Sequence, residues 1–320
     1  MLDAGGRRAA LPVRAAADTG QIHGQLSSAP MTNRDGNGWT RCGRGHRHWG
    51  RHGAAGLLLA APDEAGRQTV LLQQRSWWGS YGGAWGPPGG ARDSHESVVR
   101  AALREAIEEC AIDPRSVRVH GVVTDDHGGW TYQTVLATTA APLAATAVSE
   151  ETSEVAWVPV ADVERLRLHP GFAGQWPALR TALSPMTIIV DAANVMGSRP
   201  DGWWRDRAGA ARRLVDQIEG LAMGGVSDLP DSVQLHALER WFPRFVVVLE
   251  GAAAAGAGEV SADRQVRIVL ARGSGDDEIV LQAAETAGPC LVVTADRELR
   301  ARCEAVGAAV AGPRWLLELL

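Results

Sequence analysis

Residues 187–296 contain four short apolar segments separated by longer stretches of other composition, and this alternation constrains the fold of the second half most. The segments lie in "TIIVDAAN", "RFVVVLEG", "VRIVLARG" and "CLVVTAD", and the intervening sequence includes the helix-like "RDRAGAARRLVDQIEGLA" and "DDEIVLQAAETA". Strands buried on both faces read as continuous apolar runs, and strands that alternate with helices form parallel sheets. We therefore expect an α/β domain with a parallel, Rossmann-like sheet over residues 186–320.

The first half predicts a mixed sheet with helices packed on it. "AAGLLLAAPD" and "QTVLLQQRS" indicate a hairpin or meander, and "VRVHGVVTDD" and "TYQTVLATT" indicate two further strands. "SEETSEVAWVPVADVERL" predicts a strand that leads into a short helix. Pro170, Pro177 and Pro185 then break the pattern, which indicates a linker or a terminal helix. We expect a first α/β domain over residues 31–180.

Composition limits the setting in which such a chain works. Residues 1–30 are rich in Ala, Arg and Gly without the apolar block of a signal peptide, which predicts a disordered extension with Met31 as a candidate start. The four cysteines show no paired framework, which is typical of a cytoplasmic protein, and no apolar run approaches a membrane span. A net charge of -5 argues against broad coating of nucleic acid by charge alone, while a local arginine-lined groove remains possible in principle.

One predicted helix carries an unusual cluster of carboxylates. It lies in "GGARDSHESVVRAALREAIEECAI", and its Glu105, Glu108 and Glu109 are spaced three and four apart, so they share one helical face. Mg²⁺ binds such hard oxygen ligands, and a cation would turn their mutual repulsion into coordination. We expect the helix to start near Ser94, with Ser94 or Asp93 as its N-cap, and to end before Pro114.

The same stretch resembles the Nudix box, in which a glycine, a spaced glutamate, an Arg-Glu pair and a Glu-Glu pair fall at fixed intervals. The matching residues are Gly90, Glu96, Arg104, Glu105, Glu108, Glu109 and Ile112. Two positions depart from the pattern: Ala106 replaces a bulkier aliphatic residue, and Ala111 replaces the glycine that ends the helix. An alanine there must adopt left-handed geometry or let the helix end differently. The resemblance covers about residues 53–168.

The resemblance implies a Nudix α/β/α sandwich that hydrolyses a pyrophosphate bond in a nucleoside diphosphate-linked substrate, with Mg²⁺ or Mn²⁺ as cofactor. It assigns metal binding to Glu105, Glu108 and Glu109, and these three with Arg104 form the expected catalytic set. A general base outside the box is common in the family. Three candidates for it remain open: Glu150, Glu151 and Glu154.

Other residues near the box are candidates for substrate binding. Gly89 and Gly90 would let the backbone approach a ligand closely. The chain has twelve tryptophans against three phenylalanines, and several fall near the expected site. Trp85 and Trp130 could stack on a base, with packing in the core or loops as the alternative for each ring.

A short basic stretch, "CGRGHRHWGRH", offers Cys42, His46, His48 and His52 as metal ligands. Zinc sites of this composition typically use two paired clusters separated by a loop. The sequence shows one cluster without a second, so a basic, partly ordered arm is the favoured interpretation.

The second half places acidic and amide side chains where its strands end. These are Asp191 and Asn194, Glu250, Asp276 and Asp277, and Asp296. The carboxyl ends of parallel strands meet at one edge, where open α/β sheets bind ligands. Carboxylates that converge there could hold Mg²⁺ ions for phosphodiester hydrolysis.

The motifs "VDAANVMGS", "SGDDEIV" and "VVTADRELR" resemble those of NYN domains, a PIN-like class of ribonucleases. The resemblance implies that Asp191, Asp276 and Asp296 hold metal, with Asn194 and Asp277 in support. Acidic residues also cap helices in ordinary α/β sheets, so a domain that only binds RNA is the alternative.

Three hypotheses about function follow from the sequence. In the first, the chain cleaves a nucleotide or a nucleotide-capped substrate, with RNA as a further partner of the second domain. In the second, the carboxylates of the first domain are a relic and the second domain is the working nuclease. In the third, the chain is a non-catalytic RNA-binding or regulatory protein. The three differ in whether turnover depends on metal and on the carboxylates of each domain.

Overall fold

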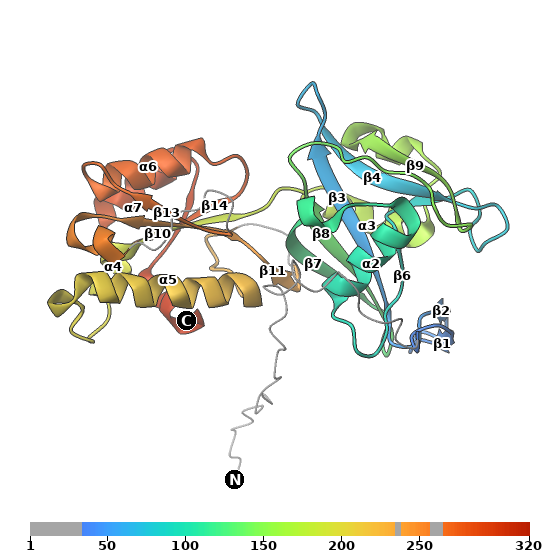
Figure 1. Ribbon diagram of the computed structural model, residues 1–320, viewed down its shortest axis with the longest axis horizontal. Helices are drawn as coiled ribbons and strands as arrows, with labels where there is room; N and C mark the ends of the chain where they lie inside the picture. The colour runs from blue at the N-terminus through green and yellow to red at the C-terminus, as the bar shows by residue number, and fades with distance from the viewer. Residues whose placement is uncertain (1–33, 234–237, 257–264) are drawn as a thin grey trace, which may run out of the picture.

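The computed structural model describes residues 34–233, 238–256 and 265–320 of the 320-residue chain. The extension predicted for residues 1–30 lies outside these ranges. The described chain forms two α/β lobes (Figure 1). Between residues 34 and 180, the strands are β1 (Trp39–Arg41), β2 (Arg47–Trp49), β3 (Ala54–Pro62), β4 (Gln68–Arg75), β5 (Trp85–Gly86), β6 (Gly89–Ala91), β7 (Arg118–Asp126), β8 (Thr131–Thr138) and β9 (Thr152–Pro159). The helices of this part are α2 (Val98–Cys110), η1 (Pro114–Ser116), η2 (Val160–Arg165) and α3 (Pro170–Leu179).

The sheet of the first lobe is mixed, as predicted. Its strand order is β11-β7-β8-β3-β4-β5, where β11 is Arg240–Trp241, with β6 also paired to β3 and β9 to β4. The pairing of β3 with β8 is parallel, and its other named pairings are antiparallel. The predicted hairpin between β3 and β4 is present through Ala60–Pro62 and Gln68–Val70.

Alternating side chains of the central strand β3 face two different layers. Leu57 and Leu59 pack in one cluster with residues of α2, whereas Leu58 packs in another with Trp176 of α3. This period of two places a helix on each face of the sheet. The first lobe is therefore an α/β/α sandwich in which α2 covers one face and α3 the other. The segment broken by prolines is thus mainly a helix, with Pro170 in its first turn and Pro177 inside it.

The second lobe contains the predicted parallel sheet. Its strands are β10 (Thr187–Asp191), β12 (Arg244–Leu249), β13 (Val266–Leu270), β14 (Cys290–Val293) and β15 (Ala309–Ala311), in the order β13-β12-β10-β14-β15. All four pairings are parallel. The helices are α4 (Ala192–Gly197), η3 (Trp203–Arg205), α5 (Arg207–Gly224), η4 (Gly251–Gly256), α6 (Gly275–Glu285), α7 (Arg297–Ala305) and α8 (Pro313–Leu319).

Helices cover both faces of this parallel sheet. Ile189 packs with Ile279 of α6 and Leu299 of α7, whereas Ile188 belongs to the cluster that holds Leu214 of α5 and Leu316 of α8. Such double coverage explains why the strands read as continuous apolar runs.

The two lobes share a seam that the sequence did not predict. Strand β11 (Arg240–Trp241) comes from the second half but pairs with β7, at the edge of the first sheet (Figure 1). Gly121 of β7 makes room for it, because a Cβ atom there would lie 2.6 Å from a methyl carbon of Leu238. The buried His120 adds a contact between its Nε2 atom and the carbonyl oxygen of Ala182, at 3.0 Å.

Candidate active site on helix α2

Helix α2 begins three residues later than predicted. Its N-cap is Ser97, whose hydroxyl accepts a hydrogen bond from the Arg100 amide at 3.3 Å. The predicted caps are used elsewhere: Asp93 accepts from the amide of Gly36, and Ser94 donates to Asp35. Tertiary contacts with the segment before β1 thus take both side chains away from the helix.

Helix α2 ends with the cap residue Ala111, where the Nudix box usually has a glycine. This residue adopts left-handed geometry, with φ 55° and ψ 32°, and its amide hydrogen-bonds to carbonyls of the last turn. Alanine therefore occupies a position that favours glycine. The helix ends before Pro114, as predicted.

Glu109 is the most enclosed carboxylate of the helix. Its side chain accepts hydrogen bonds from Gln73 Nε2 at 2.7 Å and from the Gly89 amide at 2.8 Å. Burial raises the pKa of Glu109 to about 8, and the neighbouring charge of Glu105 acts in the same direction. A carboxylate held in this way gains strongly from a nearby cation, because a cation offsets both the burial and the repulsion.

Arg104 organises the other carboxylates. Its guanidinium contacts Glu96 at 2.8 Å, Glu105 at 2.6 Å and Glu108 at 3.3 Å, and it donates to the carbonyl oxygen of Ala91 at 2.9 Å. Burial alone would lower the pKa of Arg104, but hydrogen bonds and charges from Glu96 and Glu105 raise it instead. Burial raises the pKa of Glu105 and Arg104 opposes that rise. One permanent cation thus holds three carboxylates in fixed directions.

Glu108 is the outermost of the three box carboxylates. Its side chain is 33% exposed and makes a second ion pair with Arg34, at 2.6 Å. The helix therefore presents a graded set, with Glu109 deepest, Glu105 between and Glu108 at the surface. Oxygen ligands of this kind, on one helix face, fit Mg²⁺ or Mn²⁺.

The two glycines before the helix make room for these carboxylates. A Cβ atom on Gly90 would lie 2.7 Å from the carboxylate of Glu105. The Gly89 amide points at Glu109. The structure therefore assigns Gly89 and Gly90 a direct role in positioning the box carboxylates, in addition to the substrate role expected from the sequence.

Gln73 of β4 is a site residue that the sequence analysis missed. It is 3% exposed, donates to Glu109, and accepts a hydrogen bond from Thr152 Oγ1 at 2.6 Å. The signal was available in principle, because a glutamine inside the apolar run "QTVLLQQRS" must find a partner when it is buried.

The tryptophans predicted to stack on a base have packing roles. Trp85 is 8% exposed and belongs to the main core cluster. Trp130 is also 8% exposed, donates to the carbonyl oxygen of Gly50 at 2.8 Å, and stacks on His48. Neither ring has an open face of the size that a base needs. Trp77 and Trp78, by contrast, are exposed, at 70% and 78%.

The three candidates for a general base lie in one segment near β4. Glu150, Glu151 and Glu154 are all exposed. Hydrogen bonds from Ser76 to the backbone of this segment fix it beside the strand that carries Gln73.

Comparisons with known proteins identify this half of the chain. The model of the NUDIX domain matches residues 50–180. A protein of Mycobacterium tuberculosis named "Putative 8-oxo-dGTP diphosphatase 3" is 46% identical over 160 residues, which cover 48% of this chain and 72% of that protein. The chain belongs to the Nudix family. A "Nucleoside triphosphate pyrophosphatase/Nudix hydrolase fusion protein" of Bifidobacterium longum is 37% identical over 186 residues, or 56% of this chain and 38% of that protein.

A solved Nudix structure also resembles the chain. It is named "Crystal structure of a Nudix Hydrolase from M. Smegmatis, RenU", has 45% sequence identity, and aligns with a TM-score of 0.44. The alignment covers 46% of this chain and 94% of that one.

The acidic residues of the second lobe gather at one edge of its sheet, beyond the segment that the Nudix domain model matches. Asp191 ends the central strand β10, and its carboxylate accepts from Asn194 Nδ2 at 2.7 Å and from Thr294 Oγ1 at 2.8 Å. Asp296 follows β14 and caps α7 through the Leu299 amide, at 2.8 Å. Two neighbouring strands thus deliver carboxylates to the same edge.

Asp276 of α6 faces this edge. Burial raises the pKa of Asp276, and the charges of Asp191, Asp296 and Glu250 raise it further. Asp277 lies beside it in sequence, but its side chain is 70% exposed and forms an ion pair with Arg302. It therefore contacts Arg302 rather than the carboxylates at the edge, which does not match the supporting role predicted for it. Thr294, which the sequence analysis missed, is fully buried and joins the set by bonding to both Asp191 and the Asp296 amide.

The most compact groups of metal-binding side chains lie outside both carboxylate sets. Among the described residues, two groups of three or more metal-binding side chains have ligand atoms within 4.8 Å of one another. One is Cys42, His46, His48 and His127, and the other is Asp35, Asp93 and His95. In the described ranges, neither the carboxylates of α2 nor those of the parallel sheet form such a group.

All four cysteines are free. No helix in the described ranges is long and apolar enough to cross a membrane.

Proposed function

We propose that the Nudix domain hydrolyses a pyrophosphate bond in a nucleoside diphosphate-linked substrate, with the carboxylates of α2 binding Mg²⁺ or Mn²⁺. The observation that carries the proposal is the enclosed Glu109, fixed by Gln73 and Gly89 beside Glu105. Family membership supports the reaction class. A divalent cation bound there would neutralise charge on the pyrophosphate and lower the pKa of an attacking water.

The residues of the site have separate roles in this reaction. Glu105, Glu108 and Glu109 supply oxygen ligands at three depths along one helix face. Arg104 keeps Glu105 and Glu108 in place and prevents them from moving apart in the absence of substrate. Gln73 holds Glu109 so that one of its oxygens stays directed toward Gly89. We expect the exposed Trp77 or Trp78 to contact the base.

Product chromatography after incubation with Mg²⁺ tests the proposal. The panel includes ordinary and oxidised purine nucleoside triphosphates, dinucleotides, nucleotide sugars and 5′-triphosphate RNA. The relative named for 8-oxo-dGTP makes oxidised purine triphosphates the first class to try. We expect Glu109→Gln to lose turnover, and Gln73→Leu to lose roughly 10–100-fold, as an outer partner of a ligand does. Glu64→Gln, at an exposed turn, serves as the control. Equal turnover by wild type and Glu109→Gln would refute the assignment.

For the second lobe we propose an NYN/PIN-like domain that acts on RNA through Asp191, Asp276 and Asp296. The observation that favours it is their gathering at one edge of a parallel sheet, with Asn194 and Thr294 in support. RNA cleavage with Mg²⁺, compared between wild type and Asp276→Asn, tests it. Glu285→Gln, at the far end of the same helix, is the control. RNA binding without cleavage in the wild type would favour the non-catalytic alternative.

A further inference from the structure

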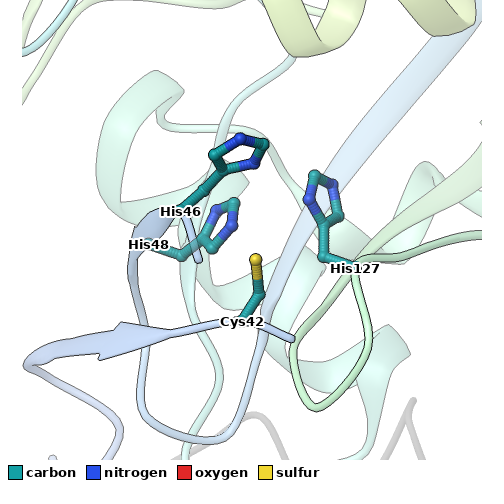
Figure 2. Close-up of side chains that lie close together, drawn as sticks. All are labelled: Cys42, His46, His48 and His127. Atoms are coloured by element: carbon teal, nitrogen blue, oxygen red, sulfur yellow. The ribbon is translucent and has the colours of Figure 1, made fainter. Parts of the chain in front are cut away.

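The N-terminal hairpin and a distant turn bring four metal-binding side chains together. Cys42, His46 and His48 come from the β1–β2 hairpin, and His127 comes from the turn between β7 and β8. Their ligand atoms all lie within 4.8 Å of one another. Figure 2 shows the sulfur of Cys42 directed toward the imidazoles of the hairpin, with His127 facing them from the other segment. The site is separate from the carboxylates of α2.

Backbone hydrogen bonds build this arrangement. The Cys42 amide donates to the carbonyl oxygen of His46 at 3.0 Å, and the Gly45 amide donates to that of Cys42 at 2.9 Å. Gly45 has a φ of 81°, which permits the tight turn between them. The Gly43 amide donates to the carbonyl oxygen of Gly128, which ties the hairpin to the second turn. The backbone therefore fixes both halves of the group independently of the side chains.

Two imidazole nitrogens in this group are buried without a hydrogen-bond partner among the residues that the structure describes. They are Nε2 of His48 and Nδ1 of His127. Leaving a buried polar atom unpaired costs about 1–3 kcal/mol, so such an atom calls for a ligand. The remaining nitrogen of His127, Nε2, lies 3.0 Å from a carboxylate oxygen of Asp125. Metal-bound histidines commonly hold their other nitrogen against a carboxylate in this way.

The surroundings also fix the direction of His48. Its ring stacks on Trp130 with centroids 3.9 Å apart and an interplanar angle of 13°. Cys42 is 6% exposed and packs with Trp130 and Ala54. His46 is exposed, which leaves a path for an ion from solvent. The rings and the thiol are thus held by packing that needs no ion, as expected of a site formed before its metal arrives.

We propose that Cys42, His46, His48 and His127 bind one Zn²⁺ ion in a structural, tetrahedral site. One thiolate and three imidazoles match the ligand preference of this ion. Zinc–sulfur and zinc–nitrogen bonds of ordinary length place tetrahedral ligand atoms about 3.3–3.6 Å apart, so shifts of about 1 Å close the group. Four protein ligands leave no open position, which makes the site structural rather than catalytic.

The zinc ligands differ in two ways from those that the sequence suggested. His52 does not belong to the group; its Nε2 atom lies 3.7 Å from a carboxylate oxygen of Asp35. The ligand that the stretch "CGRGHRHWGRH" lacked is His127, which is far away in the sequence. Zn²⁺ would join the β1–β2 hairpin to the β7–β8 turn, where the hairpin otherwise has a two-stranded sheet of its own.

Metal analysis of the full chain tests the site. The protein is stripped with a chelator and reconstituted with Zn²⁺, and elemental analysis measures the number of bound ions per chain. Co²⁺ then replaces Zn²⁺ as a spectroscopic probe. We expect one ion per chain, tetrahedral Co²⁺ bands, and a thiolate-to-cobalt charge-transfer band that Cys42→Ser removes. We expect His127→Ala to bind Zn²⁺ at least about 100-fold more weakly, since it removes a ligand rather than an outer partner. His52→Ala is the matched control from the same stretch and should bind as the wild type does.

Several results would overturn the site. These are a wild type that takes up no Co²⁺ at equimolar concentration, Co²⁺ binding without the thiolate band, and equal binding by wild type and His127→Ala. Loss of binding in His52→Ala but not in His127→Ala would also reject it. If circular dichroism shows that His127→Ala is unfolded, the thiolate band of the wild type and its loss in Cys42→Ser decide the question. None of these readouts depends on hydrolase activity.

Discussion

Protonation of one buried histidine should couple the stability of the chain to pH. His120 of β7 is 2% exposed, and its Nδ1 atom has no hydrogen-bond partner within residues 34–233, 238–256 and 265–320. Burial lowers the pKa of His120 to about 4, from an ordinary value of 6.5. The contact of Nε2 with the carbonyl oxygen of Ala182 opposes this shift without cancelling it. His120 lies at the seam of the two lobes, so charging it strains the seam.

The free energy of unfolding should fall as the pH falls, because the folded and unfolded chains bind the proton of His120 with different pKa values. Between pH 6.5 and pH 4 the unfolded chain binds the proton and the folded chain does not, so the stabilisation present above pH 6.5 is lost as the pH falls. The whole gap corresponds to about 3 kcal/mol, of which about 2 kcal/mol is lost by about pH 5.

Urea unfolding of wild type and His120→Gln at about pH 7.5 and about pH 5 measures this loss. Glutamine can still donate to Ala182 but does not titrate, so the wild type should lose about 2 kcal/mol more than the variant between the two pH values. Carboxylates that titrate in both proteins cancel in this difference. Equal pH dependence in wild type and His120→Gln would refute the argument.

Three further outcomes are expected. Ala111→Gly should raise the free energy of unfolding by about 1 kcal/mol, because the residue has a φ of 55°; denaturation measures it, and a loss of stability would contradict the strain. Gly90→Ala should lower hydrolase activity roughly 10²-fold with unchanged circular dichroism, since its Cβ atom would displace Glu105; full activity would show that the carboxylate can move freely. Mg²⁺ affinity should rise with pH up to about 8, where Glu109 loses its proton, and calorimetry should show proton release that Glu109→Gln abolishes; pH-independent affinity in the wild type would argue against Glu109 as a ligand.

The sequence predicted the elements whose patterns are local. The continuous apolar runs of β3, β10, β12, β13 and β14 gave the correct strands, because burial on both faces of a sheet sets such patterns. The start of α2 was wrong by three residues, because contacts from Asp35 and Gly36 occupy the competing caps. Those contacts join segments that no local pattern relates.

In the candidate site, too, local spacing was predictable and contacts between distant segments were not. The spacing of Glu105, Glu108 and Glu109 placed the carboxylates on one face, as observed. Gln73 and His127 were not assigned to these groups, because each completes its group only when separate strands come together. Pairing across a sheet fixes such neighbours, and a single sequence does not record which strands pair.

The segment that defines the family and the unit that folds do not coincide. Residues 50–180 match the Nudix domain model, yet the outer edge of their sheet is completed by β11, more than fifty residues further along. A protein cut at residue 180 would present the backbone of β7 as an unpaired edge, and such edges recruit other chains. Expression of the matched segment alone should therefore favour aggregation or swapped dimers. A cut after Phe242 would instead leave β10 without its neighbours β12 and β14, so the full chain is the form to express.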